Sequence, residues 1–182
     1  MIAALQGNDI ATPRVRLAAL LALGLTALGI AVIATADFSR AEVFAACVAL
    51  IFLVAVAACD AATMRAPNAL VYPGALLIPA AHFASGPTAI LGALGGGAIA
   101  FVVCLALVIA GRGRMGMGDA KFAFLCGAAA GLQGLLLMFG AAFAVGGLVA
   151  AVVLLFRVRA RNDAIAFTPF LVIGVFAAWA LL

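Results

Sequence analysis

Two aspartates stand where long apolar stretches of the chain meet short polar ones. Asp60 directly follows the apolar run LIFLVAVAAC, and Asp119 follows a glycine-rich loop and precedes AKFAFLCGAAAG. The other four acidic residues lie in tails or loops beside polar neighbours: Asp9, Asp37, Glu42 and Asp163. A carboxylate at the edge of hydrocarbon is costly, and it usually faces a bundle interior or water at a functional site. Asp60 and Asp119 are therefore the candidates for chemistry.

Two carboxylates that share a site cannot both ionise easily. The ionised member can take a proton from water, while the protonated member polarises a carbonyl group and then assists the leaving amine. This is the chemistry of aspartic proteolysis. The glycines of the loop GRGRMGMGD would let the backbone fold tightly and bring Asp119 close to Asp60. Taken singly, each aspartate could also be a helix-end acid in the headgroup region, and Asp119 could simply favour the predicted helix N-terminus.

The composition indicates which elements must position this pair. The 182 residues are 69% hydrophobic and 9% charged, with a mean hydropathy of +1.39, which excludes a water-soluble globular domain. A helix crosses a bilayer with about 20 apolar residues, so we expect an all-α, polytopic transmembrane bundle of about seven helices. The expected segments are 17–36, 41–59, 69–83, 89–110, 119–130, 135–156 and 164–182.

The division near Gly131 follows from length. Residues 122–156 form 35 residues without a charge, and a single helix of that length would be about 52 Å long, far beyond the roughly 30 Å hydrocarbon core. The stretch must therefore turn, and Gln133 between Gly131 and Gly134 is the best turn signal. The short helix before this turn would place Asp119 below the membrane interface.

The basic residues predict the orientation. With the N-terminus in the cytoplasm, only Arg40 falls outside, in a loop shared with Asp37 and Glu42. The other nine basic residues fall inside: Arg14, Arg16, Arg65, Arg112, Arg114, Lys121, Arg157, Arg159 and Arg161. This places both aspartates on the cytoplasmic side and explains the net charge of +4 without a nucleic-acid partner. Arginines, an apolar run and the residues ATA also resemble a signal peptide, which leaves cleavage after the first segment as an alternative.

Other motifs in the chain do not predict a cofactor or a metal. Gly111, Gly113 and Gly116 match GxGxxG, but a membrane helix precedes them where a dinucleotide site needs a strand. His82 has no partner at ligand spacing. The cysteines have no CxxC spacing and are expected to be small core residues: Cys47, Cys59, Cys104 and Cys126.

The polar motifs resemble those of the type IV prepilin peptidases. GMGD (116–119) followed by Lys121 is similar to the GxGDxK motif of that family, and DAATMRAPN (60–68) resembles its other aspartate motif. AFTPFLVIG (166–174) is similar to the segment that starts the last helix of the family, and GLQG (131–134) falls where the family has a short loop. The chain departs from the usual pattern at Ala66 and Ala120, where the family has larger aliphatic residues.

The resemblance implies a fold, an activity and a set of site residues. It divides the chain into residues 1–40, a tail with an added transmembrane helix, and residues 41–182, a six-helix peptidase-like domain. The implied substrate is a prepilin with a short basic leader and a hydrophobic helix, cut after a leader glycine at the cytoplasmic face of a bacterial inner membrane. Similarity to the short form found with tight-adherence (Flp) pili implies no N-methyltransferase activity, and no cofactor is expected. The implied catalytic residues are Asp60 and Asp119, supported by Gly116, Gly118, Lys121, Thr63, Arg65, Pro67, Asn68 and Pro169.

Several alternatives remain open at this point. Lys121 and Arg65 could fix carboxylate ionisation or contact substrate backbone, or they could extend to lipid headgroups. A presenilin-like protease also uses GxGD, but its other motifs differ from Cys59-Asp60 and Thr168-Pro169-Phe170. An ion-coupled transporter would use intramembrane carboxylates as relays, and a structural membrane subunit would use its glycines for helix packing. The sequence leaves the oligomeric state undetermined.

Overall fold

The computed structural model describes residues 13–111, 116–156 and 167–182. Within these ranges the chain is helical between short links, with no strand, which confirms the expected all-α class. The helices are α1 (Pro13–Thr35), α2 (Arg40–Thr63), α3 (Asn68–Ala81), the 3-10 helix η3 (His82–Ser85), α4 (Pro87–Ala110), α5 (Met117–Leu155) and α6 (Thr168–Leu181).

Four of these helices are long and apolar enough to cross a membrane: α1, α2, α4 and residues Met117–Val153 of α5. The apolar helix α6, with 14 residues, is shorter. Large apolar side chains such as Leu20, Leu91 and Leu136 are exposed on the outside of the bundle, as expected where lipid is the solvent. Helices suit that solvent because they satisfy every backbone hydrogen bond internally.

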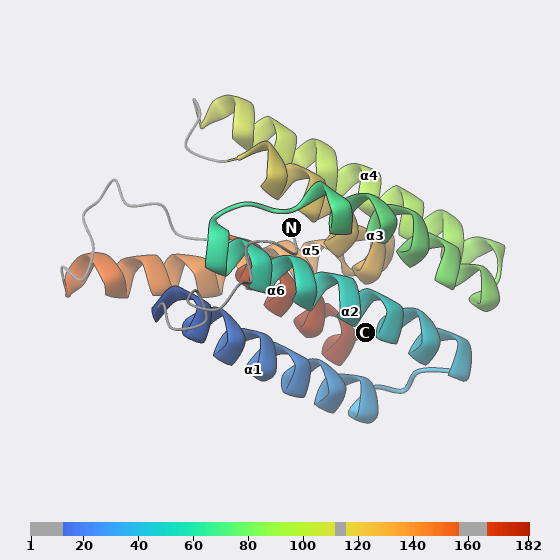
Figure 1. The fold of residues 1–182 in the computed structure, drawn as a ribbon. Coiled ribbons are helices and arrows are strands. Elements are labelled where there is room, and N and C mark those ends of the chain that lie inside the picture. The colour runs from blue at the N-terminus through green and yellow to red at the C-terminus, as the bar shows by residue number, and fades with distance from the viewer. Residues whose placement is uncertain (1–12, 112–115, 157–166) are drawn as a thin grey trace.

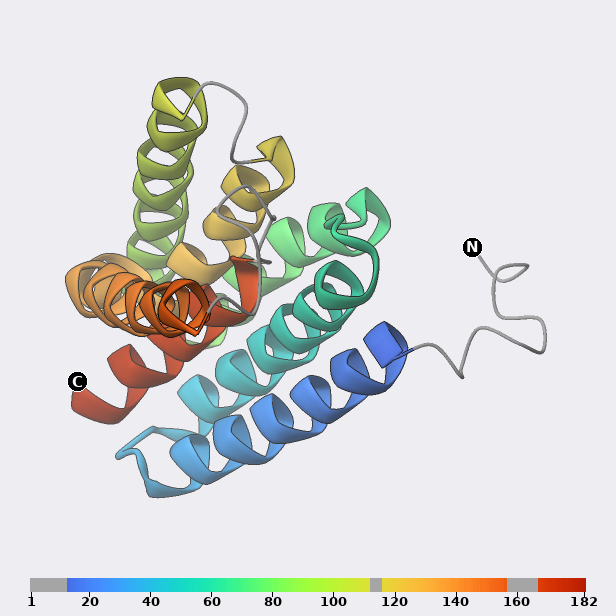
Figure 2. The same cartoon turned by 90° about the vertical axis from the view of Figure 1, so that its left-hand side faces the viewer.

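The long α5 is two helices joined at a break. Gly131 has φ 67° and ψ 175°, which is not a helical conformation. Figures 1 and 2 show the chain changing direction sharply there, from the gold half to the orange half. The turn expected within residues 131–134 is therefore confirmed, and counting the two halves of α5 separately gives the seven expected segments.

The helix ends gather at two ends of the bundle. The start of α1, the end of α2, the end of α4 and the start of α5 all lie toward the left in Figure 1, and the end of α1 and start of α2 lie at the right. Figure 2 shows the end of α2 close to the start of α5, with the start of α1 and the end of α4 on opposite sides of them. Because helices alternate in direction between short links, Asp60 and Asp119 come to the same end.

The α6 helix fills the centre of the bundle. Its residues Leu171, Val172 and Val175 are fully buried, and it packs against α1, α2 and α5. The most extensive helix pair is α4 with α5, whose backbones approach closely at Gly96 and Gly127. Small residues allow such close contacts between membrane helices.

Some expected boundaries differ from the structure. The first helix starts at Pro13 rather than Leu17, and α2 continues beyond Cys59 to Thr63. Asp60 therefore lies inside the last turn of α2, and the polar link shrinks to residues 64–67. The α3 helix ends at Ala81 and passes into η3, because Pro79 and the following turn do not extend the helix. The expected start of the last segment at Ala164 lies outside the described residues, as do five of the basic residues used for orientation: Arg112, Arg114, Arg157, Arg159 and Arg161.

Candidate active site

Asp60 is buried at one end of the bundle. Its side chain is only 6% exposed, and its Oδ2 accepts a hydrogen bond of 2.8 Å from Thr168 Oγ1, at the first residue of α6. Thr168 is itself fully buried. The end of α2 is fixed by Met64, which adopts the left-handed conformation (φ 55°, ψ 34°) and donates its N–H to the carbonyl oxygen of Asp60 at 2.7 Å. The C-cap thus terminates the helix four residues after the carboxylate.

Asp119 occupies the first turn of α5 and is only partly exposed. Its backbone N–H donates to the carbonyl oxygen of Gly116 at 3.1 Å, and its Oδ2 accepts from the N–H of Gly116 at 3.3 Å. This is the arrangement in which a carboxylate three residues into a helix bonds back to the capping residue. Asp119 therefore caps the N-terminus of α5, as the structural explanation requires. The same hydrogen bonds hold its carboxylate in place, so capping is compatible with a chemical role.

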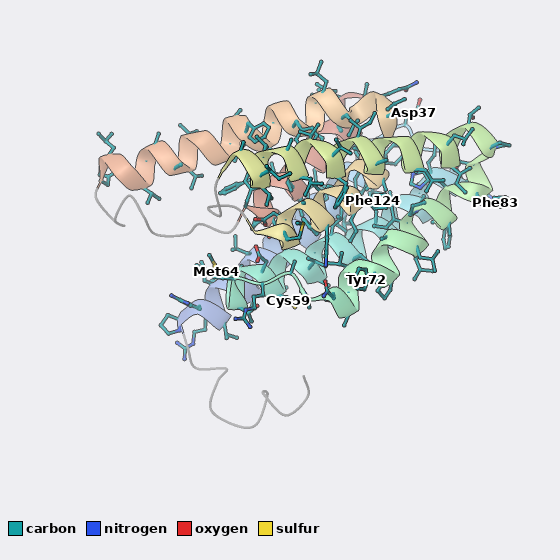
Figure 3. The ribbon with its side chains drawn as sticks, turned by 90° about the horizontal axis from the view of Figure 1, so that it is seen from above. Asp37, Cys59, Met64, Tyr72, Phe83 and Phe124 are labelled. Atoms are coloured by element: carbon teal, nitrogen blue, oxygen red, sulfur yellow. The ribbon has the colours of Figure 1, made fainter. Side chains whose placement is uncertain are left out.

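The two carboxylates lie at the same end of the bundle. The end of α2 and the start of α5 lie side by side (Figures 1 and 2), and the two helices pack against each other. In Figure 3, Cys59 and Met64, which flank this turn of α2, lie at the opposite end of the molecule from Asp37 and Phe83. Asp60 and Asp119 are thus confined to one end of the bundle.

Lys121 does not contact either aspartate in a hydrogen bond. Its Nζ lies 3.2 Å from Asn68 Oδ1 and 3.2 Å from Tyr72 OH, both on the first turns of α3. The ammonium group also lies 5.2 Å from the centre of the Tyr72 ring, within the range of a cation–π contact. Lys121 therefore joins the start of α5 to the start of α3, and its roles toward the carboxylates, the substrate backbone or lipid headgroups stay predictions.

The short link between α2 and α3 packs against the glycine loop. A β carbon on Gly118 would lie 3.3 Å from the Ala66 side chain, so the glycine leaves room for the link. Thr63 Oγ1 donates to the carbonyl oxygen of Cys59 at 2.7 Å, and it also lies 3.3 Å from that of Arg65. Pro67 caps α3, and its carbonyl oxygen accepts from Leu70 and Val71.

The predicted supporting residues differ in how they relate to the pair. Gly116 contacts Asp119 directly, whereas Gly118, Asn68 and Lys121 join the link and α3 to α5. Arg65 is exposed on the link. The remaining residues shape the backbone around the pair: Thr63, Pro67 and Pro169, the last of which is buried at the start of α6.

Sequence reasoning missed two residues that the structure brings to this end. Thr168 contacts Asp60, although only its neighbour Pro169 was predicted as a site residue. A hydroxyl side chain at the start of an apolar helix was the available signal. Tyr72 contacts Lys121 from α3, and it is the single tyrosine of the chain.

The cysteines differ in burial. Cys104 and Cys126 are buried as expected and Cys59, beside Asp60, is partly buried, but Cys47 is exposed, so the expectation of four core cysteines is wrong for Cys47. His82 Nδ1 lies 2.9 Å from the carbonyl oxygen of Ile78 in the preceding helical turn. Within the described ranges, no three His, Cys, Asp or Glu side chains are grouped as metal ligands.

The fold and the site define a helical membrane protein with two carboxylates at one end of its bundle. Comparison with known families gives the particular class. A model of the type IV leader peptidase family matches residues 47–152, which include both aspartates and more than half of the chain. The chain belongs to this family of peptidases. No curated protein and no solved structure matches it. The matched region ends before α6, so Thr168 lies outside it.

Proposed function

We propose that this chain is an aspartic endopeptidase that removes the short basic leader from Flp-type prepilins, with Asp60 and Asp119 as the catalytic pair. The strongest support is that a buried Asp60 at the end of α2 and Asp119 at the start of α5 lie at the same end of two helices that pack against each other. Both residues lie in the part of the chain that matches the leader peptidase family.

The proposed reaction uses one proton shared between the two carboxyl groups. The ionised carboxylate takes a proton from a water molecule as the water oxygen attacks the scissile carbonyl carbon, and the protonated carboxyl gives its proton to the carbonyl oxygen. When the tetrahedral intermediate collapses, the C–N bond breaks. The first carboxyl then gives its proton to the leaving amine, while the second recovers its proton from the oxygen. The pair returns to its starting state.

The orientation of the protein in the membrane belongs to the same proposal. Arg14 and Arg16 at the start of α1, Arg65 after α2 and Lys121 near the start of α5 share the end that holds the aspartates, whereas Arg40 starts α2 at the other end. Basic residues concentrate on the cytoplasmic side of membrane proteins. This distribution supports an active site at the cytoplasmic face of the inner membrane, where a basic leader would reach it.

Processing of a co-expressed prepilin tests the proposal. The substrate should have a short basic leader that ends in glycine and is followed by a hydrophobic helix, and leader removal is read as a mobility shift. Asp60→Asn and Asp119→Asn should each abolish processing, while Asp37→Asn should process like the wild type. Asp37 is a matched control because it is an exposed acid at the opposite end of the bundle.

All variants must accumulate in the membrane at equal levels. If either Asp60→Asn or Asp119→Asn processes the prepilin normally, the paired-aspartate mechanism is wrong. If the wild type accumulates but cleaves no such prepilin, the proposed substrate class is wrong, and the ion-coupled transporter becomes the function to test.

A further inference from the structure

Thr168 differs from the other threonines whose hydrogen bonds the structure describes. Thr26, Thr35 and Thr63 each donate the side-chain hydroxyl to the backbone carbonyl four residues earlier in their own helix, at 2.7, 2.9 and 2.7 Å. This local bond is the usual one for a threonine inside a helix. Thr168 is the first residue of α6, so no carbonyl of its own helix precedes it. Its hydroxyl instead reaches a carboxylate 108 residues away in the sequence.

Among the residues that the structure describes, the side chains of Asp60 and Asp119 each accept one hydrogen bond, and the bond from Thr168 to Asp60 is the shorter. It measures 2.8 Å between fully buried or nearly buried groups, whereas the bond from the Gly116 N–H to Asp119 measures 3.3 Å at an exposed position. A donor stabilises a carboxylate more than a neutral carboxylic acid, and the effect is larger away from water. The two carboxylates share one site, so the ion that is better stabilised retains the charge and the other carboxyl takes the proton.

We propose that Thr168 is a positioning residue that keeps Asp60 ionised and fixes the direction of its carboxylate. Asp60 is then the base that takes the proton from water, and Asp119 is the carboxyl that holds the proton at rest. This inference rests on the proposed peptidase function and adds to it an assignment of the two roles. It also gives α6, which lies outside the matched family region, a part in the reaction.

Ionisable groups lie on several of the elements packed against α2. The charge of Asp60 reaches Asp119 on α5 and Cys59 on its own helix. The ammonium group of Lys121 bonds to α3, where Tyr72 is the ionisable residue. The described part of α6 has no ionisable side chain. The other ionisable residues on the elements packed against α2 are Arg14 and Arg16 at the start of α1, Cys126 within α5, and His82 in η3 at the far end.

Substitutions that separate the hydroxyl from the shape of the side chain test the proposal. Thr168→Val keeps the shape and removes the donor, whereas Thr168→Ser keeps the donor. Thr26→Val is the matched control, because it removes a hydroxyl that bonds only within its own helix. Each purified, full-length variant is assayed in detergent on a peptide that spans a prepilin leader junction, with kcat and KM measured across the acidic pH range.

The expected result is a specific loss in Thr168→Val. Its kcat should fall by about 10²-fold with little change in KM, as for a misplaced catalytic group, and the acidic limb of its pH–rate profile should move to higher pH. Thr168→Ser and Thr26→Val should stay close to the wild type. If Thr168→Val fails to accumulate, Thr168→Ser and Thr168→Ala decide the question, since serine and alanine differ by the hydroxyl alone.

Two results would overturn the assignment. One is a Thr168→Val variant with the wild-type kcat and pH profile. The other is an equal loss in Thr168→Ser and Thr168→Val without a change in profile, which would show that packing is what matters. Asp60→Asn, measured beside them, keeps the two proposals apart. Cleavage by Asp60→Asn contradicts the peptidase mechanism itself, whereas an inactive Asp60→Asn with an unaffected Thr168→Val contradicts only the role of Thr168.

Discussion

The backbones of Gly96 and Gly127 touch where α4 crosses α5. A β carbon added to Gly96 would lie 2.5 Å from the carbonyl oxygen of Gly127, and one added to Gly127 would lie 2.5 Å from the Ala100 side chain. Backbone atoms cannot move aside as a flexible side chain can. The contact therefore fixes how closely α4 can hold the helix that begins with Asp119.

Gly127→Ala should destabilise the bundle for this reason. Overpacking of a tight contact costs about 1–3 kcal/mol, so the thermal unfolding midpoint in detergent should fall clearly. Gly140→Ala, in the half of α5 after the break, is the control, because a β carbon there meets nothing within 4 Å. The control should be neutral or slightly stabilising, since alanine favours a helix over glycine by up to about 1 kcal/mol. Equal midpoints for the two variants would contradict the close crossing.

Gly131→Ala tests the break in α5. The values φ 67° and ψ 175° belong to a region that essentially only glycine adopts, and another residue there costs about 1–3 kcal/mol. Space is not the cause, because a β carbon at Gly131 meets nothing within 4 Å. We expect the thermal unfolding midpoint to fall in Gly131→Ala. The midpoint should not fall in the control Gly147→Ala, where a β carbon also meets nothing within 4 Å. A Gly131→Ala variant as stable as the control would mean that the break does not need this conformation.

The contact between Lys121 and Tyr72 can be measured by a double-mutant cycle. Lys121→Met removes the donor, and Tyr72→Phe removes the hydroxyl that accepts from it. Because the pair is partly exposed, we expect a coupling free energy of only about 0.5–1 kcal/mol in unfolding measurements. A coupling near zero would mean that the hydrogen bond between Lys121 and the Tyr72 hydroxyl contributes nothing to stability. Tyr72→Phe keeps the ring, so it separates the hydrogen bond from the cation–π contact.

The start of α2 depends on a capping box at the end of the bundle away from the aspartates. Ser39 Oγ accepts from the Glu42 N–H at 3.3 Å, and Glu42 Oε2 accepts from the Ser39 N–H at 2.8 Å. Ser39→Ala should lower the free energy of unfolding by about 1 kcal/mol, while Ser39→Asp, which keeps a capping acceptor, should retain most of it. Prepilin processing should be unaffected in both, since neither residue lies near Asp60. A loss of processing with normal stability would contradict the proposed location of the site.

The sequence was sufficient to predict most of the fold because length and charge are strong constraints in a membrane protein. Residues 122–156 are too long for one crossing, which predicted the turn that the structure places at Gly131. The end of α2 was predicted one turn too early. The αL conformation of Met64 ends that helix, and nothing in the local sequence marks a methionine for this role.

The candidate site could be predicted only in part. Asp60 and Asp119 were identified because a carboxylate beside an apolar run is rare and costly. The partners of these residues depend on helix packing, which a single sequence does not reveal. Lys121 could have faced several groups, and only the fold shows that it bonds to Asn68 and Tyr72. Thr168 was missed because the bond it makes joins residues 108 positions apart.

Thr168 comes 108 positions after Asp60 in the chain, so the two residues are synthesised at different times. A ribosome delivers Asp60 and Asp119 to the membrane before it reaches Thr168, which starts α6. Until that helix is inserted, Asp60 lacks the donor that holds it in the folded protein. The growing chain therefore carries both carboxylates in an incomplete state. Under the proposed role of Thr168, a chain arrested before α6 would carry both aspartates but lack the hydrogen bond to Asp60.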